Sequence, residues 1–511
     1  MPWINGTHLH TSTWHVLFFR PSSKPCKSAT TDITASSYGS GKVSIVTAAG
    51  VIINAGSSAI QAINLASAID VSAASSVSVT ANGTIHTGLH LTPSGSQPQA
   101  ISAGYFPGNV GASNTNVNGT VSIDNFADVT ADAGTGINAF NYGNGNVTLI
   151  NEANTHVYGA QYGITAYSLS TGAGSSGNVT INIGANVTIT AGDLYGLSGI
   201  NSSVNHGGSI SITTSTGDII NSGGSGIQAN IATASALSSS QISITTAAGF
   251  IHSGFDMGTG GGQPAGILAG YTAGSGNTVT PGVHGNVVLD NAAAVNADAG
   301  AGIILYNYGV GNVSATLEAS SIVSGITAGM NIFANGGGNV TVANSGTLTS
   351  PSGYGIIAGT GNVLGTTGNG IISITNSGAI TSLGALSAAA VVQINNWSTQ
   401  NASFTNSANA FVTSNLFSKT NLNVAFNFYS GTLSTNTGGV VINNSGQVSG
   451  NVTLGGSFLV TGANPSARKR SVYRPGANPS TRNVPSAFGN VPPTKAVSPC
   501  LRIVIDPTVT G

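Results

Sequence analysis

Short strand-like starts recur along most of this chain, and they constrain its fold more than any other feature. Each start alternates apolar and polar residues, as in Val43–Thr47 and Ile210–Thr214. The starts fall at Val43, Val77, Val121, Val147, Val179, Ile210, Ile242, Val287, Val313, Val340 and Ile372. A period of two that is rich in β-branched residues predicts strands with one buried face. Helix is disfavoured because long stretches lack Leu, Glu and Lys at helical spacing.

The chain also repeats on a longer scale. The matched segments are Ile85-His86 with Ile251-His252, Ala131–Gly134 with Ala297–Gly300, and Gly163–Ala166 with Gly325–Ala328. The first two matches have an offset of 166 residues and the third an offset of 162. A unit of about 165 residues therefore occurs twice, and a third copy is predicted to begin near Ile371.

Within each unit, the pattern predicts three short strands per turn of chain. The alternating start is followed by a second short strand, as in Val51–Asn54, and often by a third with the form Gly-Ile-x-Ala, as in Gly136–Ala139. Such a unit can hide its apolar side chains only under the next one. The prediction is an all-β, right-handed parallel β-helix solenoid with disordered ends. Roughly fifteen coils at about 4.8 Å each would give a rod near 70 Å long.

Two details of the repeat lead to further expectations. Gly-Asn-Val recurs at 145–147, 177–179, 285–287, 311–313, 338–340 and 450–452. Because Gly and Asn tolerate positive φ, this triplet predicts a corner from which Val opens a strand. The intervals before Val121 and Val287 are 44 and 45 residues long, which predicts an extra coil or a projecting loop in each unit.

The predicted domain organisation has three parts. Residues 1–41 form a disordered leader, and residues 42–461 form the β-helix, with units at about 43–208, 209–370 and 371–461. Residues 462–511 form a basic, Pro-rich tail that is disordered by composition. Cys26 and Cys500 are the chain's two cysteines and lie outside the repeats, so the repeats have no disulfide framework and no cysteine metal site.

Charge is almost absent from the repeats. Between Lys42 and Lys419 there are 376 residues with no Lys or Arg, nine Asp and two Glu, for a formal charge of −11. Globular domains normally draw about a quarter of their residues from Asp, Glu, Lys and Arg. A surface without cations is poorly suited to nucleic acid or other phosphates, so we expect no nucleic-acid partner.

Several residues are candidates for a functional site. Asp124, Asp132, Asp290 and Asp298 form duplicated pairs, which could serve glycoside hydrolysis but are better interpreted as turn and cap carboxylates copied with their repeat. His86 and His252 are equivalent copies, each without a second ligand at metal-binding spacing. We therefore predict no catalytic, cofactor-binding or metal-binding residue, and no cofactor.

Tyrosine precedes glycine at positions 142, 158, 162, 195, 308 and 354. Such aromatics could stack on sugars if they share a face. The preferred interpretation is that each tyrosine packs at a corner of its coil.

The β-rhythm, the Gly-Asn-Val-Thr-Ile phrases and the near absence of basic residues resemble the passenger region of bacterial autotransporters and the shaft of filamentous-haemagglutinin-like adhesins. The resemblance covers about residues 40–460. It implies a non-catalytic stalk or adhesin, surface-exposed or secreted, outer-membrane associated in a Gram-negative bacterium. Its partners would be host or abiotic surfaces, carbohydrate, or the chain itself. The alternative from a different class is a polysaccharide-active β-helix enzyme, either a glycoside hydrolase or lyase-like.

Two features of that family are missing here. No clear secretion signal precedes the repeats, and no transmembrane segment of about 20 apolar residues is present. The C-terminus lacks the alternating strands of a translocator barrel. The expectation is a fragment, or a reading frame altered at both ends, so that contact with the outer membrane would depend on a missing translocator.

Overall fold

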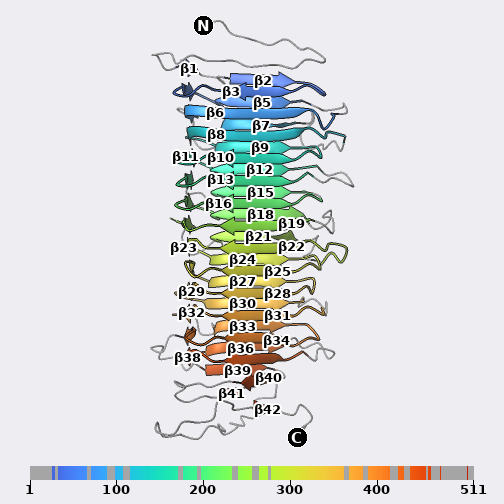
Figure 1. The fold of residues 1–511 in the computed structure, drawn as a ribbon, viewed down its shortest axis with the longest axis vertical. Coiled ribbons are helices and arrows are strands. Elements are labelled where there is room, and N and C mark those ends of the chain that lie inside the picture. The colour runs from blue at the N-terminus through green and yellow to red at the C-terminus, as the bar shows by residue number, and fades with distance from the viewer. Residues whose placement is uncertain are drawn as a thin grey trace.

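The computed structural model describes most of the repeat region and short pieces of both ends. The described residues are 26–28, 33–65, 71–88, 98–106, 116–170, 177–192, 197–205, 207–232, 240–255, 264–273, 278–361, 368–383, 390–414, 424–430, 438–449, 451–455, 458–461, 472–473 and 503–504. Within these residues there are strands and turns but no helix. The strands stack into a rod whose colours run in sequence order from one end to the other (Figure 1).

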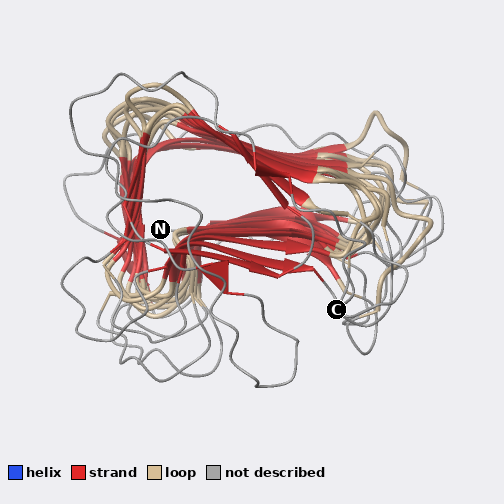
Figure 2. Cartoon of the chain, turned by 90° about the horizontal axis from the view of Figure 1, so that it is seen from below, coloured by secondary structure: helices blue, strands red, loops and turns tan. Residues whose placement is uncertain are grey.

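The rod is a parallel β-helix with two sheets. Seen along its axis, two broad faces lie opposite each other and a narrower third face joins them at one end (Figure 2). Each typical coil contributes two strands to a 27-stranded sheet, called sheet A here, and one strand to a 15-stranded sheet, called sheet B. The predicted three-strand coil and the estimate of roughly fifteen coils are both confirmed.

Sheet A has two rows of strands. Its first row contains β3 (Val43–Val46), β6 (Ser76–Thr87), β8 (Thr120–Ala131), β10 (Val147–Asn151), β13 (Val179–Ile183), β16 (Ile210–Thr214), β19 (Gln241–Thr246), β22 (Asn286–Asn291), β25 (Val313–Leu317), β28 (Val340–Asn344), β31 (Ile372–Asn376), β34 (Ala402–Asn406), β37 (Val440–Asn444), β40 (Phe458–Thr461) and β42 (Ile503–Val504). Its second row contains β1 (Cys26–Ser28), β4 (Ile52–Ala55), β11 (His156–Gly159), β14 (Thr188–Ala191), β17 (Ile219–Ser222), β20 (Phe250–Ser253), β23 (Ala294–Ala297), β26 (Ile322–Gly325), β29 (Thr347–Ser350), β32 (Ala379–Ser382), β35 (Phe411–Ser414) and β38 (Gln447–Ser449). The long strands β6 and β8 run through both rows.

Sheet B contributes one strand to each coil. In order these are β2 (Ile33–Ser37), β5 (Ile60–Asn64), β7 (Gln99–Tyr105), β9 (Thr135–Asn141), β12 (Ile164–Ser168), β15 (Ile200–Val204), β18 (Ile227–Ala232), β21 (Ile267–Thr272), β24 (Ala301–Asn307), β27 (Ala328–Ala334), β30 (Tyr354–Thr360), β33 (Ala390–Asn396), β36 (Val424–Ser430), β39 (Asn451–Gly455) and β41 (Val472–Tyr473). All its pairings are parallel, as a solenoid requires.

The core is a set of stacked columns. In sheet B, Ile137, Ile164, Ile200 and Ile227 occupy the same register position on successive coils, and each is fully buried. Sheet A stacks its valines and isoleucines in the same way. Every strand start expected from the alternation lies within one residue of an observed strand of sheet A.

Buried asparagines form a second kind of column. Asn344 donates from Nδ2 to Oδ1 of Asn376 at 2.7 Å, Asn376 donates to Asn406 at 2.8 Å, and Asn406 donates to Asn444 at 2.9 Å. Asn125 and Asn151 make the same contact at 2.7 Å in the first unit. Because a buried amide without a partner is costly, the ladder satisfies these groups only while neighbouring coils stay in register.

The Gly-Asn-Val triplet works differently from the expectation. In the five copies whose glycine is described, that glycine does not have positive φ, which is found instead at Asn154, Asn186 and Asn409 among other turn residues. At Gly145 and Gly311 a Cβ would collide with the carbonyl oxygen of the glycine one coil earlier. Glycine is therefore required at this corner because neighbouring coils approach each other too closely for a Cβ atom. The copy at 450–452 leads into β39 of sheet B, so it does not mark the same corner.

The asparagine of the triplet joins one coil to the next. Asn146 accepts from the backbone N–H of Asn178 at 3.0 Å, and Asn286 accepts from that of Asn312 at 2.9 Å. Asn312 in turn accepts from Asn339 at 2.9 Å. The triplet thus supplies both the clearance and the acceptor that this corner needs.

The two long intervals contain no extra coil. β6 pairs directly with β8, and β19 pairs directly with β22. Of the two alternatives, the extra coil is therefore wrong. Part of each interval, residues 89–97 and 256–263, lies outside the described residues.

The structure corrects the repeat alignment in one place. Ile164 opens β12 of sheet B, whereas Ile326, its partner at an offset of 162, follows β26 of sheet A. The offset of 166 is kept through sheet B, because Phe140 pairs with Tyr167 and Tyr306 pairs with Phe333. The match of Gly163–Ala166 with Gly325–Ala328 is therefore a similarity of sequence between different faces.

Strand pairing starts before residue 42 and continues beyond 461. β2 pairs with β5, β1 pairs with β4, β41 pairs with β39, and β42 pairs antiparallel with β40. The remainder of the predicted leader and tail lies outside the described residues.

Candidate functional site

The two sheets differ in charge. None of the fifteen strands of sheet B contains Asp, Glu, Lys, Arg or His in its described residues. The described carboxylates lie on sheet A or in the turns that adjoin it: Asp124, Asp128, Asp132, Glu152, Asp218, Asp290, Asp298 and Glu318. Within the described residues, the rod therefore has one weakly acidic side and one side without charged strand residues.

The duplicated histidines and aspartates meet in pairs. His86 Nε2 lies 2.7 Å from Asp132 Oδ2, and His252 Nε2 lies 2.6 Å from Asp298 Oδ2. In both pairs the side chains are about one-third exposed, with values from 27 to 44%. Sequence comparison found the four residues as copies but did not pair them, because His and Asp are 46 residues apart in the chain.

Aromatic rings flank the imidazole of His252. The ring centroid of His252 is 5.8 Å from that of Phe250 and 5.8 Å from that of Phe255. A third pair, His156 and Asp128, lies 3.2 Å apart on the same row of strands and is more exposed. Among the residues that the structure describes, no three His, Cys, Asp or Glu side chains come together as metal ligands.

Asp124 meets Glu152, a partner that the sequence analysis did not assign. Partial burial raises the pKa of Glu152 above its ordinary value, and the charge of Asp124 and a hydrogen bond to it raise that pKa further. Asp290 and Glu318 are 166 residues downstream of this pair. Oδ1 of Asp124 and Oδ1 of Asp290 are both buried without a hydrogen-bond partner within the described part of the chain.

The Asp124–Glu152 geometry is unlike that of a glycosidase. Catalytic carboxyl groups are about 5–5.5 Å apart in retaining enzymes and about 6.5–9.5 Å apart in inverting ones, which leaves room for the sugar. Two carboxyl groups that hydrogen bond to each other are closer than either range. Glu152 lies half-buried on the turn after β10.

The aromatic residues gather on the other side of the rod, on the outer face of sheet B. Phe140 and Tyr167 occupy paired positions on β9 and β12, and Tyr306 and Phe333 occupy the equivalent positions on β24 and β27. Tyr142 and Tyr308 follow β9 and β24. Three aromatic residues in each unit thus form a patch, here called the first patch (Phe140, Tyr142, Tyr167) and the second patch (Tyr306, Tyr308, Phe333).

Glycines allow the rings to lie flat across neighbouring strands. A Cβ at Gly104 would collide with the ring of Phe140, and one at Gly270 would collide with the ring of Tyr306. The Tyr306 hydroxyl reaches two coils away and donates to Oδ1 of Asn230 at 2.7 Å. Burial raises the pKa of Tyr306 well above its usual range, so this phenol stays a neutral donor.

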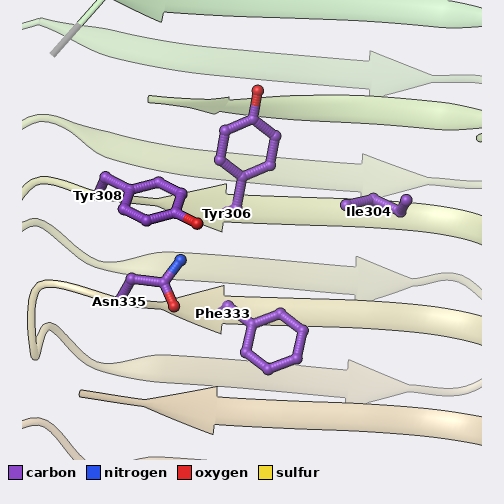
Figure 3. Close-up of a pocket in the computed structure, with 5 residues that line it drawn as sticks. All are labelled: Ile304, Tyr306, Tyr308, Phe333 and Asn335. Carbon is purple, nitrogen blue, oxygen red and sulfur yellow. The ribbon is translucent and has the colours of Figure 1, made fainter. Parts of the chain in front are cut away.

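In the second unit the patch lines a groove. A groove of about 440 Å³ is lined by Ile304, Tyr306, Tyr308, Phe333 and Asn335 (Figure 3). All five side chains are half-buried. In Figure 3 the rings of Tyr306 and Phe333 point away from each other along the rod, and Tyr308 and Asn335 lie together at one end.

The first patch has a fourth aromatic residue beside it. Phe106 packs against Tyr142 and Phe140, with ring centroids 5.6 and 6.3 Å apart. The residue equivalent to Phe106 in the second unit is Thr272, 166 positions later. The second patch therefore has no aromatic ring at this position.

The Tyr-Gly pattern identified part of this surface. Tyr142 and Tyr308 belong to the two patches, whereas Tyr158 lies on β11 of sheet A, Tyr162 lies in the turn after β11, and Tyr354 opens β30. Tyr195 lies outside the described residues. Phe140, Tyr167, Tyr306 and Phe333 were missed because no glycine follows them; their shared offset of 166 was the available signal.

A second apolar row lies outside the second row of sheet A. Ile219 and Phe250 occupy paired positions there and are each 39% exposed. Ile52, Ile322 and Phe411 continue the same register row and are also exposed. This row is interrupted by Asp128, His156 and several Thr and Ala positions, so it forms separate apolar points rather than a groove.

Comparison of the chain with protein-family models, with curated proteins and with solved structures gives no match. The class that fold and surface define is a parallel β-helix rod with one uncharged, aromatic face. A search of the described residues for a helix able to cross a membrane finds none.

Proposed function

We propose that this chain is a non-catalytic β-helical stalk or adhesin, exposed on or secreted from a Gram-negative cell. It adheres to a host or abiotic surface, to carbohydrate or to other copies of itself. The proposed location on a Gram-negative cell comes from the resemblance of the sequence to autotransporter passengers. The observation that carries adhesion is the uncharged outer face of sheet B, which extends over fifteen strands.

Physical chemistry supports this use of such a face. Ser, Thr, Asn and aromatic side chains offer weak hydrogen bonds and apolar contact, and neither depends on ion pairing. Repetition along a rod, or among many rods, converts weak contacts into avid ones because later contacts form at high effective concentration. Adhesion of this kind should persist in high salt.

The test is adhesion of the full-length protein to epithelial cells, glass and polystyrene at low salt and at about 1 M salt, where the screening length is about 3 Å. We expect similar retention at both. Light scattering of the free protein over the same range tests self-association. Absence of retention on every surface together with a monomeric protein would contradict the proposal, and so would retention that disappears at 1 M salt.

One observation keeps the polysaccharide-active enzyme as a second candidate. Glu152 has a raised pKa beside Asp124, and a general acid in glycoside hydrolysis also needs a raised pKa. The close contact of the two carboxyl groups favours the stalk instead. Reducing-end assays on neutral and acidic polysaccharides, compared between the wild type and Asp124→Asn, separate the two: turnover lost in the variant would establish the enzyme.

A further inference from the structure

We infer that the groove of the second patch binds a neutral saccharide, with a pyranose ring packed against Tyr308 and Phe333. The inference deepens the proposed function by naming one ligand class and one site for it. It depends on the groove's shape, on the chemistry of its lining and on the comparison with the first patch, where Phe106 packs against Tyr142.

The lining selects against charged ligands. The groove is formed by three aromatic residues, one isoleucine and one asparagine, and sheet B places no charged side chain around it. A uronic acid or a phosphorylated sugar would lose hydration there without gaining a cation. A neutral sugar loses much less, and its hydroxyl groups can be paired one at a time.

The rings suit one face of a sugar. The C–H groups on one face of a pyranose form an apolar surface with a slight positive charge, which packs against the negative face of an aromatic ring. Tyr306 and Phe333 start from paired positions but extend in opposite directions, over Gly270 and Gly359 respectively. The gap between them exposes aromatic surface to solvent in a shallow, open groove.

One amide is placed to pair with a hydroxyl group of a bound sugar. Asn335 lines the groove beside Tyr308. A small number of polar groups in a mostly apolar recess of this size is typical of ligand sites.

The two units provide a natural control. Tyr142 and Tyr308 are equivalent, but Phe106 packs against Tyr142, whereas Thr272 takes the equivalent position before Tyr308. The substitution Thr272→Phe should therefore place against Tyr308 a ring that the same fold already accommodates in the first patch. This variant is less prone to unfolding than a large-to-small change in the core.

The experiment uses the full-length protein and three neutral hexasaccharides: β-1,4-linked glucose, α-1,4-linked glucose and β-1,4-linked mannose. Trigalacturonate serves as the acidic comparison. Saturation-transfer NMR detects binding, and calorimetry gives affinity at low salt and at about 1 M salt. We expect at least one neutral hexasaccharide to bind with salt-independent affinity, and trigalacturonate not to bind.

The variants locate the site. Thr272→Phe and Phe333→Ala should each weaken binding by about tenfold or more, because the first covers the ring of Tyr308 and the second deletes a stacking ring. Tyr158→Ala, which removes a tyrosine from the outer face of sheet A, should leave affinity unchanged. Circular dichroism and thermal unfolding confirm that each variant is folded.

The outcomes separate this inference from the proposed function. If no neutral hexasaccharide binds, or if binding is unchanged in both folded groove variants, the inference is wrong even when the rod still adheres to surfaces. If hexasaccharides bind through the groove but the rod adheres to nothing, the site stands and the adhesive role is wrong.

Discussion

The amide nitrogen Nδ2 of Asn376 lies 2.8 Å from Oδ1 of Asn406, at the middle of a four-residue ladder that crosses four successive coils. Each of the four asparagines is buried. The Nδ2 groups of Asn344, Asn376 and Asn406 donate to the next coil and, at 3.3–3.4 Å, also to a backbone carbonyl of their own coil. The ladder therefore adds side-chain hydrogen bonds between coils to the main-chain hydrogen bonds and the side-chain packing that also join them.

Asn376→Ala should destabilise the rod by about 2–3 kcal/mol, because it removes the ladder bonds of both neighbours and leaves their polar atoms buried. Thermal unfolding and hydrogen exchange of the third unit measure the effect. Thr375→Ala is the matched control, since Thr375 is the adjacent exposed residue. Equal stability of the two variants would show that the ladder contributes nothing.

Asp218 predicts a pH dependence. It is 3% exposed, and burial raises its pKa to about 6, although N–H groups of Val187 and Ser215 donate to it at 3.0 and 2.7 Å. Because the folded pKa is above the unfolded value of about 3.9, ionisation at neutral pH destabilises the fold. That penalty disappears as pH falls from about 7 through 6 toward 4.

The measurement is the difference in unfolding free energy between wild type and Asp218→Asn at pH 7 and at pH 4. We expect the wild type to gain about 2 kcal/mol relative to the variant on acidification, in line with the size of the shift. If the difference in unfolding free energy between the two proteins is the same at both pH values, the raised pKa of Asp218 is contradicted. Comparing the two pH values within each protein cancels the loss of one hydrogen bond in the variant.

Tyr105 and Tyr271 are equivalent buried residues whose hydroxyl groups have no hydrogen-bond partner among the described atoms. Tyr271→Phe should leave stability unchanged or raise it by about 1 kcal/mol, because a buried hydroxyl without a partner is costly. Urea unfolding measures this. A loss above 1 kcal/mol would indicate an ordered water molecule on the hydroxyl.

Gly311→Ala should destabilise the corner by about 1–3 kcal/mol or more, since the new methyl group would meet the backbone of Gly285 rather than a side chain that can move. Gly282→Ala is the control, because a Cβ there meets no atom within 4 Å. Thermal unfolding of the two variants should differ clearly. Similar midpoints would mean that the coils can separate at this corner without cost.

The His252–Asp298 pair should contribute little to stability. Both side chains are partly exposed, and exposed ion pairs typically contribute about 0.2–1 kcal/mol. A double-mutant cycle with His252→Gln and Asp298→Asn should give a coupling energy within that range. A larger coupling would point to a role beyond joining β20 to the turn after β23.

Much of the fold could be predicted because the signal is local. The alternation at Val147 or Ile210 depends only on neighbouring residues, and one buried face is enough to place a strand there. Alignment of the repeats was harder, because Gly163–Ala166 resembles Gly325–Ala328 in sequence while lying on a different sheet. Short β-branched phrases are interchangeable between faces, so similarity alone cannot assign them.

The candidate groove could be predicted only in part. Tyr142 and Tyr308 were visible as Tyr-Gly copies, but their neighbours Phe140 and Tyr306 were not. The difference between Phe106 and Thr272 has no meaning in the sequence until both are placed against a tyrosine of the next coil. The same holds for Glu152, whose contact with Asp124 depends on pairing between β8 and β10.

The sequence by itself determined the coil: strand positions, the two long units, the absence of charge and the parallel solenoid all follow from periodicity and composition. The tertiary structure alone decided which side chains meet. Neighbours across coils are about 4.8 Å apart in space but usually 26 to 45 residues apart in the chain. Their contacts are set by register, and register is a property of the stacked coils together rather than of any one segment.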